Sequence, residues 1–96
     1  MYFISGFYKF KNIPRIKRNK EIIQSYFINK DIRGTIIISK EGINGTISAR
    51  KKNLDLTINK IKKTFKFSSF DSSNSSMSKY QPSHRGKVKI KSELFP

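Results

Sequence analysis

The residues of this sequence with the clearest chemical potential are cationic. One basic cluster occupies the N-terminal turns of a predicted helix, a second follows a proline near the C-terminus, and one more lysine stands before a glycine-containing turn. Lys and Arg at this density contact phosphate groups, because each neutralised phosphate releases a condensed counterion. The candidate phosphate-binding and RNA-binding residues are Arg15, Lys17, Arg18, Lys20, Lys40, His84, Arg85, Lys87 and Lys89.

The whole chain is strongly basic, with 21 Lys and Arg residues against 6 Asp and Glu residues and a formal net charge of +15. Such an excess attracts polyanions, and nucleic acid is the natural partner. A biased coding composition is the alternative explanation for the many lysines, which would then only solvate the surface. That alternative does not explain why acidic residues are so scarce.

The sequence contains no evident catalytic constellation. The acidic residues are scattered over different predicted elements and His84 stands alone, so no paired carboxylates, Ser-His-Asp set or metal site is predicted. The chain has no cysteine, which excludes thiolate nucleophiles and disulfides within it. We therefore predict no catalytic residue, no metal and no cofactor.

The N-terminal segment from Tyr2 to Lys11 alternates as a strand does. We expect Ile4, Tyr8 and Phe10 to face the core. The opposite face would then present aromatic rings beside a cation, which suits either base stacking or docking of a protein. This candidate docking or stacking face consists of Phe3, Phe7 and Lys9.

Two stretches have the periodicity of amphipathic helices, one from Arg15 to about Lys30 and one that Asn53 is expected to cap. Between them, the β-branched run from Gly34 to Ser48 predicts a hairpin. Its turn carries a motif whose glycines are expected to supply positive φ angles. The motif residues of this turn are Glu41, Gly42, Asn44 and Gly45.

The C-terminal third is harder to interpret. Phe65 to Asp71 suggests an irregular strand, and the serine-rich stretch from Ser72 to Ser78 suggests a flexible loop. Lys87 to Lys91 alternates cleanly, with Val88 and Ile90 expected to point inward and the lysines outward.

The predicted order is strand, helix, strand, strand, helix, strand, with one more strand at the end. This order favours a single α+β domain with a ferredoxin-like sandwich, in which two helices cover one face of an antiparallel sheet of four to five strands. We expect the first and third strands to pair in parallel and the other sheet face to stay open. No apolar run approaches the roughly 18–20 residues of a membrane span, so we expect a cytoplasmic domain without a membrane partner.

Three blocks of the sequence resemble a known family. The blocks are Tyr8–Phe10, Gly34–Ile38 with Glu41–Thr46, and Gln81–Val88. They resemble, in the same order, the N-terminal part of the bacterial rhodanese-domain tRNA uridine hydroxylases. The resemblance implies an acylphosphatase-like fold for residues 1–96 as a single N-terminal domain. It also implies tRNA, contacted at the anticodon region, as a partner.

Members of that family catalyse the oxygen-dependent 5-hydroxylation of the wobble uridine of tRNA, and their presumed catalytic cysteine lies in a rhodanese domain that follows. We therefore expect that domain to lie outside this chain and to be its second partner. The chain alone is expected to be inactive and to serve in tRNA binding and substrate recognition.

Two alternatives from other classes remain open at this point. One is a protein-interaction domain that docks a rhodanese domain through its open sheet face. The other is a small acyl-phosphate hydrolase, since true acylphosphatases resemble this fold. Those enzymes use an arginine in a glycine-rich loop after the first strand and an asparagine as its partner. Here Asn12–Arg15 contains no glycine, and Asn44 is the candidate for the asparagine, although a structural role in its turn is the simpler interpretation.

Overall fold

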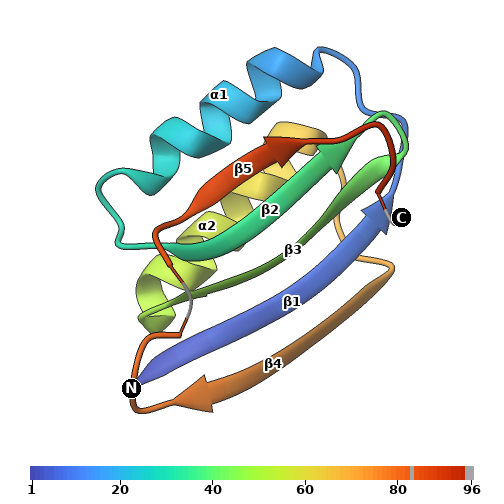
Figure 1. Ribbon diagram of the computed structural model, residues 1–96. Coiled ribbons are helices and arrows are strands. Elements are labelled where there is room, and N and C mark those ends of the chain that lie inside the picture. The colour runs from blue at the N-terminus through green and yellow to red at the C-terminus, as the bar shows by residue number, and fades with distance from the viewer. Residues whose placement is uncertain (83, 95–96) are drawn as a thin grey trace.

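The computed structural model describes residues 1–82 and 84–94, and it shows a five-stranded sheet covered on one face by two helices (Figure 1). This confirms the predicted ferredoxin-like sandwich. The strand order across the sheet is β4-β1-β3-β2-β5. In chain order, the elements are β1 (Tyr2–Phe10), α1 (Ile16–Phe27), β2 (Arg33–Ser39), β3 (Gly42–Ala49), α2 (Lys51–Phe65), β4 (Ser72–Ser78) and β5 (Lys87–Ile90).

The sheet is mixed, and one predicted pairing is wrong. β3 pairs antiparallel with both β2 and β1, and β4 pairs antiparallel with β1. The expected parallel pairing of the first and third strands does not occur, because the tight hairpin reverses β3 relative to β2, which runs in the same direction as β1. Only β5 joins its neighbour β2 in parallel.

The core lies between the helices and the inner face of the sheet. Burying one large apolar side chain contributes roughly 1.5–3 kcal/mol relative to leaving it exposed, so this layer is the main source of stability. The helices contribute Ile23, Phe27, Leu54, Ile61 and Phe65 to this core, and the central strands contribute Ile36, Ile38, Ile43 and Ile47.

The side chains of β1 face the opposite way from the prediction. Phe7 is 5% exposed and stacks on Phe70, with ring centroids 4.6 Å apart, and Phe3 packs against the same core. The predicted open-face surface of Phe3, Phe7 and Lys9 is therefore wrong, since these side chains lie on the helix side while Phe10 is 52% exposed. Both faces of β1 carry apolar residues, so alternation alone does not choose between them, and packing against Phe70 decides.

The serine-rich segment is a strand, not the predicted flexible loop. β4 pairs along its whole length with β1, and the Asp71 backbone N–H donates to the Tyr8 carbonyl just before it (N···O 2.9 Å). The predicted strand from Phe65 to Asp71 is also wrong, because Phe65 ends α2. β4 is held in the sheet by backbone hydrogen bonds, which form whatever the side chains are. Its serine-rich composition therefore did not predict a strand.

The ends of both helices differ from the prediction. α1 begins at Ile16 and ends at Phe27, and the Ile28 N–H donates to the Ser25 carbonyl as the chain turns away. α2 begins at Lys51, so Asn53 does not cap it. The Asn53 amide instead donates to the Lys30 carbonyl at 3.2 Å, which connects α2 to the turn that follows α1.

Most of the glycine motif lies in β3, and the turn itself is Lys40–Glu41. Gly42 has the expected positive φ of 150°, and a Cβ atom there would lie 2.1 Å from the Lys9 carbonyl oxygen. Gly45 does not have a positive φ, so that part of the prediction is wrong. Its role is to leave space, because a Cβ atom at Gly45 would lie 3.1 Å from the Phe7 ring.

Candidate nucleic-acid interface

The sheet face that points away from the helices, called the open face here, carries a polar and basic half. Residues that are paired across two neighbouring strands lie on the same face of the sheet, and successive residues along one strand alternate between the two faces. Because Ile36 and Val88 are buried in the core, their neighbours in β2 and β5 point to the open face. This half of the open face presents Thr35 and Ile37 from β2, Asn44 and Thr46 from β3, and Lys87 and Lys89 from β5.

A shallow depression of about 510 Å³ lies on this half of the open face. Four of the nine candidate RNA-binding residues line it, together with one motif residue, Asn44. Its floor is made of strand residues and its rim of cations. The lining residues are Gly34, Thr35, Ile37, Asn44, Thr46, His84, Arg85, Lys87 and Lys89.

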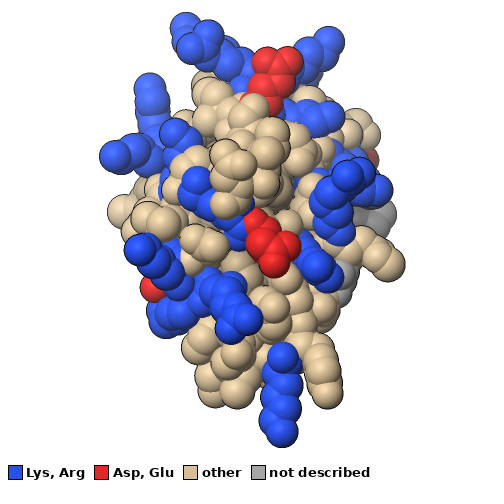
Figure 2. Space-filling model, turned by 90° about the vertical axis from the view of Figure 1, so that its left-hand side faces the viewer, with Lys and Arg blue, Asp and Glu red and all other residues tan. Residues whose placement is uncertain are grey.

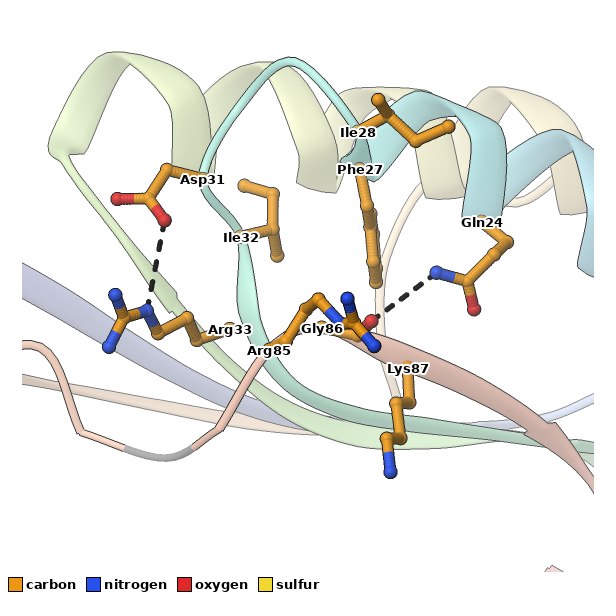
Figure 3. A pocket seen from close by; sticks show the side chains of 9 residues that line it. All are labelled: Gln24, Phe27, Ile28, Asp31, Ile32, Arg33, Arg85, Gly86 and Lys87. Atoms are coloured by element: carbon orange, nitrogen blue, oxygen red, sulfur yellow. Dashed lines mark hydrogen bonds and ion pairs between the residues drawn. The ribbon is translucent and has the colours of Figure 1, made fainter.

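A second cavity, a groove of about 770 Å³, runs between the end of α1 and the start of β5 (Figure 3). Its helix side is mainly apolar and its strand side carries cations. The lining residues are Gln24, Phe27, Ile28, Asp31, Ile32, Arg33, Arg85, Gly86 and Lys87. Arg85 and Lys87 line both cavities, so these two cations separate the groove from the depression.

Side-chain hydrogen bonds from α1 fix β5 in place. The Gln24 carbonyl oxygen accepts from the Val88 N–H at 2.8 Å, and the Gln24 amide donates to the Gly86 carbonyl at 3.3 Å. Gln24 thus satisfies backbone groups at the outer edge of an edge strand, which would otherwise be open to pairing with another chain. As expected, Val88 is buried and the lysines of β5 are exposed. Ile90 pairs with the buried Ile38 and lies on the same sheet face as Val88, as predicted, although it is 39% exposed at the end of the strand.

The segment that carries Arg85 sits close against β2. The Gly34 N–H donates to the His84 carbonyl, and the Gly86 N–H donates to the Ile32 carbonyl, both at 3.0 Å. A Cβ atom at Gly86 would lie 2.5 Å from that Ile32 oxygen, so glycine permits this approach. The backbone at Arg85 is therefore held on both sides, and its side chain extends from a fixed base.

The motif residues Glu41 and Asn44 hold the segment that follows β5. The Glu41 carboxylate accepts from the Leu94 N–H at 2.6 Å, and the Asn44 amide donates to the Leu94 carbonyl at 2.8 Å. Leu94 itself is 1% exposed. We call these two contacts the Leu94 latch, and they give Glu41 and Asn44 a structural role.

The remaining candidate cations lie elsewhere. Among the described residues that line the two cavities, none comes from the start of α1 or from the hairpin turn. Arg15 is the N-cap of α1, with a φ of 48°, and the Lys40 carbonyl accepts from the Ile13 N–H at 3.1 Å. Arg15 and Lys40 therefore belong to the end of the sheet where β2 turns into β3, with Lys17, Arg18 and Lys20 on the adjoining helix.

Positive charge is not confined to the cavities. Figure 2 shows Lys and Arg side chains spread across one face of the molecule, with few carboxylates among them. Beside the groove, the Arg33 guanidinium group lies 3.7 Å from the Asp31 carboxylate and partly neutralises its negative charge. Charge alone therefore favours polyanions over much of the surface, and only the cavities distinguish one region.

Several residues of this region were not predicted from the sequence. Arg33, Thr35 and Thr46 reach the cavities only through the register of β2 and β3, and Gln24 does so through helix packing. Alternation within the hairpin could have suggested Thr35 and Thr46, whereas Gln24 offers no signal of its own.

The described part of the chain shows no group of three or more His, Asp or Glu residues that could hold a metal ion. Within the same residues, no helix is long and apolar enough to cross a membrane.

The fold defines an acylphosphatase-like domain, and comparison with known proteins specifies its family. Residues 2–94 match the model of the UPF0176 acylphosphatase like domain, so the chain belongs to this family. A tRNA uridine(34) hydroxylase of Pelagibacter ubique (strain HTCC1062) is 54% identical over all 96 residues, which make up 32% of that protein. The chain also covers 34% of a protein with the same name from Ehrlichia ruminantium (strain Welgevonden), with 30% identity. It thus spans about a third of the length of these curated relatives.

Solved structures agree on the fold alone. An acylphosphatase from Bacillus subtilis superposes with a TM-score of 0.59 and 10% identity, over 94% of this chain and 98% of that one. A bacterial light-regulated adenylyl cyclase reaches a TM-score of 0.62 with 13% identity, over 97% of this chain and 29% of that one. Identities this low carry no information on activity.

The loop after β1 argues against the hydrolase alternative. The N–H groups of Lys11 and Ile13 donate to the carbonyls of Glu41 and Lys40, so these two donors are committed within the protein and do not face a phosphate. The amide of Asn44 is engaged by the Leu94 carbonyl.

Proposed function

We propose that this chain is the tRNA-binding, substrate-recognition domain of a cytoplasmic tRNA wobble-uridine 5-hydroxylase. The proposal gains support from the names of its relatives, of which one is 54% identical over the whole chain. The observation that carries the binding role is the depression, where His84, Arg85 and Lys87 surround a polar floor on the open face.

The chemistry of the depression suits an RNA backbone. Cations at the rim contact phosphates, and the hydroxyl groups of Thr35 and Thr46 suit the ribose 2′-hydroxyl, which both donates and accepts hydrogen bonds. Phosphate contacts position the RNA without reading its sequence. The chain's task in this proposal is therefore to hold the anticodon region near an active site that other residues supply.

The hydroxylation itself is assigned to the rest of the parent protein, in the rhodanese domain that the family resemblance implies. The chain contains no cysteine, and its single histidine lies on the rim of the depression without a carboxylate partner among the described contacts. We expect the chain to show no hydroxylase activity alone.

The test is binding of the chain to an anticodon stem-loop with a wobble uridine and to a scrambled hairpin, over salt from about 50 to 200 mM. The variant Arg85→Ala/Lys87→Ala is compared with Lys52→Ala/Lys63→Ala, which removes the same charge from exposed positions on α2. We expect the first variant to bind at least tenfold more weakly and its salt slope to fall by roughly one and a half, since each lost phosphate contact removes about 0.7–0.9.

The α2 variant should keep most of the affinity. Equal losses in the two double variants would show that binding depends on total charge and not on the depression, and would contradict the proposal.

A further inference from the structure

The groove beside Arg85 combines an apolar wall, which the depression lacks, with two cations that it shares with the depression. Its helix side is apolar, formed by Phe27, Ile28 and Ile32, and its strand side carries Arg85 and Lys87 (Figure 3). Ile28 is 75% exposed at the lip of the groove, although it is a large apolar residue on a very polar chain. A ligand that fits must have an apolar body with an anionic group attached.

We propose that this groove holds an unpaired nucleobase of RNA, with the adjoining phosphate on Arg85 and Lys87. The inference rests on the proposed function in that RNA is the ligand, but it assigns a different cavity and a different chemistry. A nucleobase has an apolar face and a charged phosphate next to it, which matches the order of apolar and cationic groups across the groove. Recognition of bases displaced from a stack is the usual way in which proteins read single-stranded RNA.

The position of the two cations relates the groove to the depression. Because Arg85 and Lys87 line both cavities, a phosphate placed on them has the groove on one side and the polar depression on the other. An RNA strand that crosses Arg85 and Lys87 would place one base in the groove and the next nucleotide in the depression, over Thr35 and Asn44. The geometry thus accommodates two successive nucleotides of a loop.

Hydrogen bonds hold the helix and strand sides of the groove together. Gln24 fixes β5 through two backbone contacts, and the Gly86 N–H donates to the Ile32 carbonyl across the floor. At the far end, the Asp31 carboxylate is paired with Arg33 at 3.7 Å, so the acid is partly neutralised. Its volume of about 770 Å³ falls in the range of roughly 300–1,000 Å³ that is usual for ligand pockets.

The test combines a protein variant with an RNA variant. Ile28→Ser removes the exposed apolar lip, and Leu56→Ser, at a 41% exposed position on α2, is the matched control. Each protein binds the intact stem-loop and a set of stem-loops with one abasic loop position. We expect Ile28→Ser to bind the intact RNA about 5- to 10-fold more weakly, in the lower part of the range for contacts to single bases.

One abasic position should reproduce this loss and make the RNA indifferent to Ile28→Ser, while Leu56→Ser has no effect and Ile28→Phe restores affinity. If Ile28→Ser and Leu56→Ser bind alike, or if every abasic RNA still responds to Ile28→Ser, the base-binding groove is wrong. If Arg85→Ala/Lys87→Ala still weakens binding in that case, the proposed function stands without it. An Ile28→Ser variant that binds RNA normally but loses a protein partner would reassign the groove to protein docking.

Discussion

At one edge of the sheet, β4 carries no Lys, Arg, Asp or Glu among its seven residues, whereas at the other edge β5 alternates lysines with apolar residues. The β4 half is stabilised by backbone pairing with β1 and by packing of Phe7, Phe67 and Phe70. The β5 half is stabilised by polar side-chain contacts from Gln24. In a chain with a net charge of +15, an uncharged edge is informative, because it shows that the cations are not uniformly distributed.

The contrast suggests why the two halves differ. Aromatic rings pack against one another in the β4 half, and neither of the two cavities is lined by a residue of β4. Polar anchors hold the β5 half while leaving space beside the strand, and both cavities occur there. We infer that the β5 half of the sheet is the half that binds a ligand.

The largest effect expected is on stability, from the aromatic packing of the β4 half. Phe7→Ala should lower the free energy of unfolding by about 3–5 kcal/mol, since it removes a buried ring and its contact with Phe70. Phe10→Ala, at a position that is 52% exposed in the same strand, should cost under about 1 kcal/mol. Urea unfolding measures both values, and the opposite ranking would restore the original prediction for the faces of β1.

The hydrogen bonds of Gln24 in the β5 half are expected to contribute less to the free energy of unfolding than the aromatic packing of the β4 half does. Gln24→Ala removes the partners of the Val88 N–H and the Gly86 carbonyl, which should lower the free energy of unfolding by about 1–3 kcal/mol. The matched control Asn59→Ala changes an exposed residue of α2 and should cost about 0.5 kcal/mol or less. Urea unfolding and amide hydrogen exchange at Val88 are the measurements, and unchanged exchange at Val88 would show that Gln24 does not anchor β5.

The Leu94 latch should give the smallest effect, because it holds only the last described residue. Glu41→Ala should speed amide exchange at Leu94 by about tenfold, which corresponds to roughly 1.4 kcal/mol and lies near the upper end of the roughly 0.5–1.5 kcal/mol that a hydrogen bond usually contributes. Glu21→Ala removes an exposed carboxylate from α1 and should leave that exchange rate unchanged. Equal rates in the wild-type chain and Glu41→Ala would mean that the latch does not form in solution.

The sequence predicted the parts of the fold that depend on local patterns. The hairpin and both helices were foreseen, because runs of isoleucine and a clear periodicity mark them. The face of β1 was not, since Ile4 and Tyr8 on one side are as apolar as Phe3 and Phe7 on the other, and the deciding partner Phe70 is remote in sequence. β4 was missed because serines give no apolar signal, although they pair through the backbone as well as other residues do.

The candidate site was foreseen only in part. Lys87 and Lys89 were expected to point outward and Arg85 to contact phosphate, and all three line the depression, but the start of α1 lies apart from it. The cavities depend on strand register and on the contact of Gln24 with β5, which are properties of the assembled sheet. Local spacing in the sequence contains neither.

The most direct test of the central claim is to map the RNA contact on the isotope-labelled chain by NMR. The stem-loop with a wobble uridine is titrated at near-physiological salt, and backbone amide shifts are followed in both halves of the sheet. We predict the largest changes at residues 84–89 and 33–37, with little change in β4. Changes spread evenly over α2 and the remaining basic surface, or centred on β4, would contradict the account.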